Sequence, residues 1–141
     1  TQPLPEDGHK IRDPGVRYLR LTVLPGEYSV WRLAADAPLP PIEPGSFLSM
    51  TRTSDELSVV SQSTDVPEGA LAEVGWRCLR VEGPLPFEMM GVLAALSAPL
   101  AKAKVPIFVV STYDTDYLLV KAADLERACA ILRDEGHVVA L

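Results

Sequence analysis

The densest group of chemically capable side chains in this chain is the polar run 111–116, which reads Ser-Thr-Tyr-Asp-Thr-Asp. Hydroxyls and carboxylates can donate to and accept from the charged groups of a ligand, so this run could line a small polar pocket. Asp and Thr also favour turns, because their side chains bond nearby backbone groups. The alternative is therefore a solvated turn that only fixes the register of a hairpin, and the residues alone favour that alternative.

Catalytic chemistry is not indicated by these groups. Asp114 and Asp116 alternate along an expected strand, so their side chains should point to opposite sides and not share a site. No nucleophile stands near them for acid–base work, and Ser111 and Thr112 have no histidine arranged as a triad base. The chain also lacks a phosphate-binding loop, and we expect that it is not an enzyme.

Metal, nucleic-acid and membrane functions are not indicated either. The cysteines Cys78 and Cys129 are far apart, and the histidines are His9 and His137, so no metal-ligand spacing appears and no cofactor is expected. A net charge of −6 without a Lys/Arg cluster disfavours nucleic acid. There is no apolar run long enough to span a membrane, and TQPLPEDGHK does not resemble a signal peptide, so a cytoplasmic location is expected.

The elements that would hold the polar run follow a regular order in the second half of the chain. Apolar alternation, helical periodicity and turn residues predict a strand, a helix, two strands, a helix and a strand. Their predicted bounds are Trp76–Val81, a helix from Phe87 with Met90, Leu93 or Ala94, and Ala98 at core spacing, then Pro106–Val110, Asp116–Lys121, Asp124–Glu135 and Val138–Leu141. This order is that of a ferredoxin-like α+β sandwich.

The first half of the chain predicts strands but no convincing helix. The predicted strands are Tyr18–Leu24, Tyr28–Leu33, and the two arms of a hairpin, Phe47–Arg52 and Glu56–Ser61. Prolines exclude a regular helix from residues 34–46, and the segment that ends at Val74 is expected to form one or two helical turns. We therefore interpret residues 18–74 as a degenerate copy of the module formed by residues 75–141, after a flexible arm at residues 1–17.

A family resemblance appears in the second half. The stretch LRVEGPLPFEMMGVLAALSAPLAKAKVPIFVVSTYDTDYLLVKAADLERACAILRDEGH resembles the ACT domain, above all tandem-ACT proteins related to the eukaryotic cytosolic arginine sensor. The upstream hairpin FLSMTRTSDELSVVS is similar to that family's hairpin. The resemblance implies two tandem ACT-like modules with the ferredoxin-like βαββαβ fold. It also implies a regulatory or sensor protein that binds an amino acid at an ACT–ACT interface, and a homodimer. The alternative is a ligand-free ACT module that mediates protein–protein contacts as a homodimer.

The resemblance further implies a set of ligand-binding residues. They are Gly83, Pro84, Leu85, Phe87, Pro106, Ile107, Thr112, Tyr113 and Asp116. The loop before a helix would offer N–H groups to the carboxylate of an amino acid, and Asp116 would accept from an ammonium or guanidinium group. Pro86 and Pro106 depart from the family pattern, because each removes a backbone donor from this region.

Overall fold

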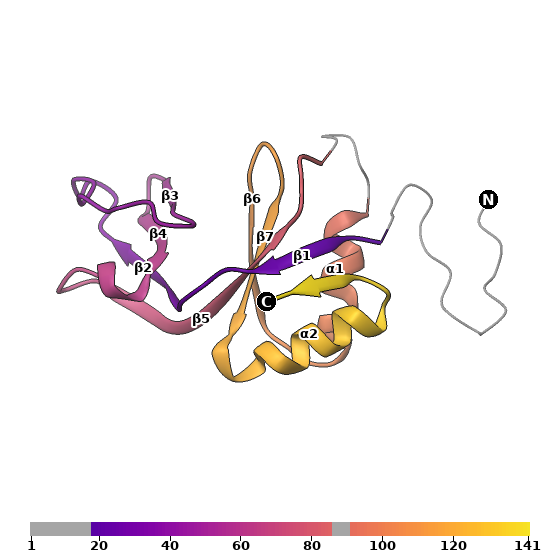
Figure 1. The fold of residues 1–141 in the computed structure, drawn as a ribbon. Helices are drawn as coiled ribbons and strands as arrows, with labels where there is room; N and C mark the ends of the chain where they lie inside the picture. Colours follow the sequence, from indigo (N-terminus) through magenta and orange to yellow (C-terminus); the bar gives the residue numbers. More distant parts are fainter. Residues whose placement is uncertain (1–17, 86–90) are drawn as a thin grey trace, which may run out of the picture.

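One long strand, β5 (Leu71–Val81), connects the two halves of the chain (Figure 1). The computed structural model describes residues 18–85 and 91–141, so the predicted arm at 1–17 and the predicted site residue Phe87 lie outside the described residues. The first part of β5 pairs with β2 (Tyr28–Leu33), and its second part lies between β1 (Arg20–Val23) and β7 (Asp116–Lys121).

Strands predominate, and they form one eight-stranded sheet. The remaining elements are β3 (Ser49–Arg52), β4 (Leu57–Gln62), the 3₁₀ turn η1 (Ser63–Asp65), α1 (Val92–Lys102), β6 (Ile107–Ser111), the 3₁₀ turn η2 (Ala122–Asp124), α2 (Leu125–Asp134) and β8 (Val138–Ala140). The predicted strands and hairpins of both halves are present, with ends shifted by a residue or two in most of them.

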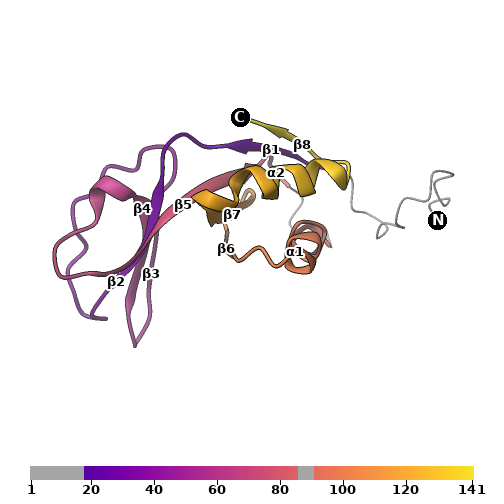
Figure 2. The same cartoon turned by 90° about the horizontal axis from the view of Figure 1, so that it is seen from below.

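The second half has the predicted ferredoxin-like α+β arrangement, with one added strand. Helices α1 and α2 lie together beside the sheet, whose strands here run in the order β6-β7-β5-β1-β8 (Figures 1 and 2). Strand β1 is the addition, since it lies between β5, to which it is antiparallel, and β8, to which it is parallel. Leu19, Leu21 and Val23 alternate toward the helices as the period of two predicts, and all three are buried.

The helices bury one face each against this sheet. In α2 the buried residues are Ala128, Cys129 and Leu132, as the periodicity predicts. In α1 the predicted register is wrong, because Leu93 is 40% exposed and the buried residues are Val92, Leu96 and Leu100. The stretch is almost uniformly apolar, so several faces of the helix suit a core equally well by sequence, and packing against the sheet selects the face.

The segment that ends at Val74 forms a strand, and the prediction of helical turns there is wrong. Its backbone pairs with β2, with Ala72 opposite Trp31 and Leu71 opposite Arg32. Cross-strand hydrogen bonds outweigh the weak helical preference of so short a segment. The strand then continues through Gly75, at the predicted limit between the two modules, where φ is +80°.

The first half packs against the face of the sheet that the helices leave uncovered. The ring of Phe47 lies 4.3 Å from that of Tyr117 on β7 and 6.2 Å from that of Tyr28 on β2. Trp76, Cys78 and other residues of this face complete a second apolar cluster between the two halves. A third cluster, built on Trp31, Leu57 and Val59, is covered by the proline-rich connection at 34–48.

Candidate functional site

A cavity of about 400 Å³ lies where the β6–β7 turn meets the start of α1, and we call it the turn–helix pocket. Its lining combines residues of the turn, the first residues of the helix and one residue of the loop after β5. They are Ser111, Thr112, Tyr113, Asp114, Thr115 and Asp116, then Gly91, Val92, Leu93 and Ala94, and Leu85. The whole polar run 111–116 therefore lines a cavity, and it also forms the turn that was the alternative interpretation.

The turn is held closed by its own threonines. The backbone N–H and the hydroxyl of Thr112 both donate to the carbonyl of Thr115, at 2.8 and 2.9 Å. The hydroxyl of Thr112 also accepts from the N–H of Thr115 at 3.3 Å. These bonds fix the positions of Tyr113 and Asp114 at the tip, in agreement with the known preference of such side chains for turns.

The loop after β5 is bonded to the same turn. The buried hydroxyl of Thr115 donates to the carbonyl of Val81 at 2.7 Å, and the N–H of Leu85 donates to the carbonyl of Asp114 at 2.7 Å. At Gly83 a Cβ atom would lie 3.1 Å from the carbonyl oxygen of Asp114, so the close approach favours glycine. The pocket wall is thus built from two segments that lie more than 25 residues apart in the sequence.

The start of α1 supplies hydrogen-bond donors to the pocket. The first N–H groups of a helix have no acceptor within the helix, and here they belong to Val92, Leu93 and Ala94. The residue before them, Gly91, has a φ of +81° and carries no side chain that could cap them. The helix end is positively polarised, so it favours an anion.

The opposite side of the pocket is acidic. Asp116 is partly buried at the first position of β7, and Asp114 is exposed at the tip of the turn. The lining residues include no lysine or arginine. The pocket therefore offers an anion-binding helix end and a cation-binding carboxylate within one cavity, which is the charge pattern of a zwitterion.

Four of the predicted site residues line this pocket, namely Leu85, Thr112, Tyr113 and Asp116. Tyr113 is 84% exposed and lies at the rim. Gly83 and Pro84 stand beside it in the loop that contacts the turn, without lining it.

Pro106 and Ile107 lie at the far end of β6, away from the turn that follows Ser111. One chain therefore does not bring them to the pocket. The sequence prediction missed the residues at 91–94, although a glycine directly before an apolar helical run, with no capping side chain, is a readable signal of an open helix start.

No group of three or more His, Cys, Asp or Glu residues within residues 18–85 and 91–141 could hold a metal ion. No helix in the described part of the chain is both long and apolar enough to cross a membrane.

Family models match most of the chain. The model of the ACT domain matches residues 71–134, and the model of an N-terminal domain matches residues 26–69. The human protein CASTOR3P is 27% identical over 66% of this chain and 65% of its own length. The human cytosolic arginine sensor for mTORC1 subunit 1 is 34% identical over 43% of this chain. This chain thus spans about two thirds of the first relative and 20% of the arginine sensor.

Solved structures resemble this chain over most of its length. Aspartate kinase from Clostridium acetobutylicum aligns with a TM-score of 0.61 at 13% identity, over 92% of this chain and 37% of its own, which shows likeness of fold. The protein Atu0741 from Agrobacterium tumefaciens aligns with a TM-score of 0.83 at 37% identity, over 89% of this chain and 95% of its own. The chain therefore contains an ACT domain at residues 71–134 and belongs to one family with Atu0741.

Proposed function

We propose that this chain is a non-catalytic regulatory or sensor protein that binds an amino acid in the turn–helix pocket. The observation that carries the proposal is that the uncapped start of α1 and the carboxylate of Asp116 line the same cavity. The ACT domain at residues 71–134 and the similarity to proteins named as arginine sensors support a regulatory role.

The two charged groups of an amino acid match the two sides of the pocket. The ligand carboxylate would accept hydrogen bonds from the N–H groups of Val92 and Leu93, where the helix end is positively polarised. The ligand ammonium would donate to Asp116, with Asp114 adding negative potential at the rim. The threonine bonds within the turn would hold Asp116 in place before the ligand arrives, which lowers the cost of binding.

A thermal-shift screen of the standard amino acids at millimolar concentration tests this proposal. One or a few of them should raise the melting temperature, because a ligand at 100 times its Kd stabilises the folded state by about 2.7 kcal/mol. Asp116→Asn should abolish the shift, whereas Asp134→Asn, at an exposed position of α2, should leave it unchanged. Unchanged melting with every amino acid would contradict the proposal.

A second function, self-association through the open edge of β6, is favoured by a separate observation. Strand β6 pairs only with β7 in the described chain, and its sequence IFVVS carries no charge, proline or bulge to protect the other edge. Antiparallel pairing of two β6 strands about Val109 would place Ile107 of the partner subunit opposite Ser111. We infer that such a homodimer would bring the partner's Pro106 and Ile107 to the pocket, which would then lie at an ACT–ACT interface.

Light scattering over a dilution series separates the two functions. A homodimer that dissociates on dilution, together with a thermal response to an amino acid, would support a pocket shared between subunits. A dimer whose melting temperature does not respond to any amino acid would support the alternative function, a module that only mediates protein–protein contacts. A monomer at all concentrations would contradict the β6 pairing and would leave the ligand to be bound by one chain.

A further inference from the structure

A second hollow, of about 560 Å³, lies in the first half of the chain beside β6, and we call it the Arg32 groove. It is lined by Val30, Trp31, Arg32, Glu56, Ser58, Leu71, Ala72, Glu73 and Phe108. No residue is shared with the turn–helix pocket, so the groove is not an extension of that site.

The strand register explains which side chains meet in the groove. Arg32 on β2 is directly opposite Ser58 on β4 and Leu71 on β5, and the next position on the same face pairs Val30 with Glu73. Residues directly opposite one another in a sheet project to the same face, so these five side chains share one surface. Val30 and Phe108 also pack on one apolar cluster between the two halves. The groove therefore has an apolar floor and a charged rim.

The charges at the rim are not neutralised by one another. Arg32 is exposed, and its guanidinium donates to the carbonyl of Asp55 at 2.9 Å. Among residues 18–85 and 91–141, no ion pair within 4.0 Å joins Arg32 to Glu56 or Glu73. A cation and two carboxylates thus stand around an apolar floor, and this pattern suits an amphipathic ligand that carries both charges.

The separate attachment points of Arg32 and Glu73 favour a short peptide over a single amino acid. Arg32 and Glu73 are diagonal neighbours across β2 and β5, a relation that separates side-chain origins by about 7–8 Å. The ends of an extended dipeptide are about 7 Å apart, whereas the two charged groups of a free amino acid are attached to one carbon.

The first part of β5 also has an edge to which an extended chain could bind. Between Leu71 and Val74 it pairs with β2 alone, because pairing with β7 begins at Trp76 and pairing with β1 begins at Leu79. All four residues of this segment are exposed. Addition of a short extended segment to a strand edge is a general mode of peptide recognition.

We propose that the Arg32 groove is a second ligand site, which takes a peptide of two or three residues with apolar side chains. The peptide carboxylate contacts Arg32, its ammonium contacts Glu73 with Glu56 nearby, and its side chains cover Val30 and Phe108. This inference does not depend on amino-acid binding in the turn–helix pocket.

Intrinsic tryptophan fluorescence provides the test, with the dipeptide Leu-Leu as the probe. Trp76 contacts the ring of Phe108, which lines the groove, at a centroid distance of 6.3 Å, so its emission reports on the groove. The side chain of Trp31 is buried on the opposite face of β2 and supplies a constant background. Leu-Leu should give a saturable change. N-acetyl-Leu-Leu-amide, which lacks both charges, and free leucine should each bind at least about tenfold more weakly, a factor that corresponds to about 1.4 kcal/mol.

Charge variants locate the site. Arg32→Gln and Glu73→Gln should each weaken Leu-Leu binding roughly tenfold, because each removes a charge-assisted hydrogen bond. Asp116→Asn, in the turn–helix pocket, should leave Leu-Leu binding unchanged. Because Arg32 also contacts Asp55, the melting temperature of its variant is checked, and the exposed Glu73→Gln decides the matter if that variant unfolds.

Three results would overturn the inference. The first is no saturable response to Leu-Leu at millimolar concentration. The second is equal binding of the blocked peptide, and the third is loss of binding in Asp116→Asn, which would place the peptide in the turn–helix pocket.

Discussion

At the scale of single residues, Gly136 illustrates how a close contact restricts the sequence. Gly136 follows the end of α2 and has a φ of +100°. A Cβ atom at this position would lie 2.2 Å from Cε1 of Tyr18. Any side chain at this position therefore meets both backbone strain and a clash with the ring. Gly26 offers a comparison, since its φ is +81° but nothing lies within 4 Å of the Cβ position.

We predict that Gly136→Ala destabilises the chain more than Gly26→Ala. The second variant should cost about 1–2 kcal/mol of unfolding free energy, from the left-handed backbone alone. The first should cost this amount plus roughly another 1 kcal/mol, because Tyr18 must move away from its position. Urea unfolding of both variants measures the difference, and equal losses would show that the ring accommodates the methyl group freely.

Thr115 is the residue that joins the turn to β5. Thr115→Val keeps the shape of the side chain but removes the buried bond to the carbonyl of Val81. The expected loss is about 1–3 kcal/mol of unfolding free energy, because a buried acceptor is left unpaired. Thr51→Val, at an exposed position of β3, is the control and should change the free energy by less than about 0.5 kcal/mol. Equal effects in chemical denaturation would contradict the role of Thr115.

The thiol of Cys78 gives the chain a dependence on alkaline pH. Burial raises the pKa of this thiol from 9.0 to about 12. The unfolded state therefore releases this proton first, and the contribution of the neutral thiol to stability is complete below pH 9 and lost as the pH rises toward 12. At pH 10 the loss should be about 1.4 kcal/mol.

Urea unfolding at pH 8 and pH 10 measures this contribution. Cys78→Ala should be less stable at pH 8 because it leaves a cavity, but its free energy of unfolding should fall less between the two pH values than that of the unmodified chain. The burial that raises the pKa of Cys129 adds a background to both proteins. An equal fall in both would show that Cys78 does not titrate in this way.

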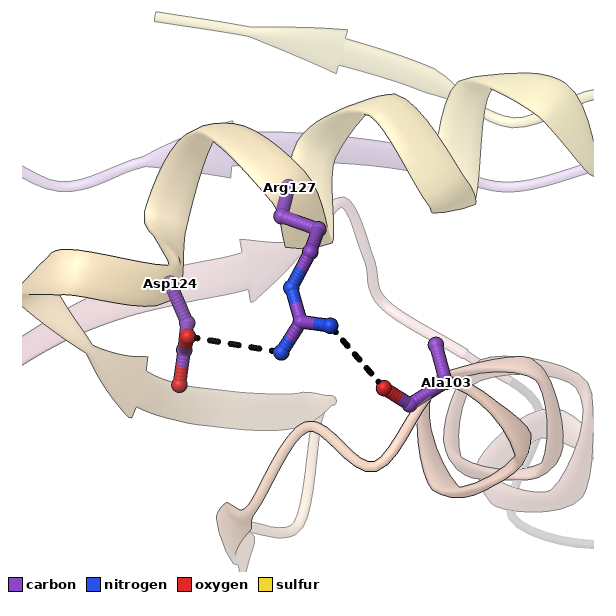
Figure 3. Close-up of polar contacts among 3 residues, drawn as sticks. All are labelled: Ala103, Asp124 and Arg127. Carbon is purple, nitrogen blue, oxygen red and sulfur yellow. Dashed lines mark hydrogen bonds and ion pairs between the residues drawn. The ribbon is translucent and has the colours of Figure 1, made fainter.

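At the scale of elements, an arginine links the two helices. Arg127 on α2 donates to the carbonyl of Ala103, just after the end of α1, at 3.0 Å, and it lies 3.5 Å from the carboxylate of Asp124 (Figure 3). The side chain is about half exposed, so solvent weakens its ion pair. We predict that Arg127→Met costs about 0.5–1 kcal/mol of unfolding free energy, mainly through the lost bond to Ala103.

Lys102→Met is the matched control for this prediction. Lys102 is exposed in the last turn of α1. Its substitution by Met removes a positive charge from the same region as Arg127→Met does. Thermal melting of the two variants should show the larger decrease for Arg127→Met. A similar decrease in both would assign the effect to net charge and not to the contact between the helices.

Elements with a clear local pattern were predictable from sequence. Tyr28–Leu33 and Asp116–Lys121 combine β-branched and aromatic residues with turn signals, and both strands have the predicted bounds. The buried face of α1 was not predictable, because Leu93 and Leu96 are equally apolar and only the sheet distinguishes them. The strand at Leu71–Val74 was missed because its structure depends on a partner strand some 40 residues earlier.

In the candidate site, too, local neighbours were predictable from the sequence and distant ones were not. Thr112 and Asp116 belong to one local polar run, so their proximity could be predicted from the sequence alone. The start of α1 is more than 15 residues away, and only the crossing of the helix over the sheet brings Gly91 beside that run. Ile107 was assigned to the site by family resemblance, and the length of β6 separates it from the pocket within one chain.

At the scale of the whole molecule, the two halves share strands and do not form separate sheets. β1 is the first strand of the first half in sequence, yet it lies between β5 and β8 in the sheet of the second half. It is held there by the N–H of Leu19, which donates to Nδ1 of the buried His137 at 3.1 Å, and by the N–H of Val138, which donates to the carbonyl of Leu19 at 2.9 Å. Removal of β1 would expose the edges of both neighbouring strands.

This arrangement predicts that residues 75–141 do not fold alone, although they contain most of the ACT-domain match. The fragment lacks β1, and the absence of Leu21 and Val23 would leave a gap in the core beneath α2. Far-UV circular dichroism of the fragment should show no cooperative urea transition, whereas the intact chain should show one transition, coincident with that of tryptophan fluorescence. Addition of a peptide that spans residues 18–25 should restore part of the transition, because it supplies the missing central strand. A cooperative fragment without the peptide would mean that β8 closes directly onto β5, and that the module is independent of the first half.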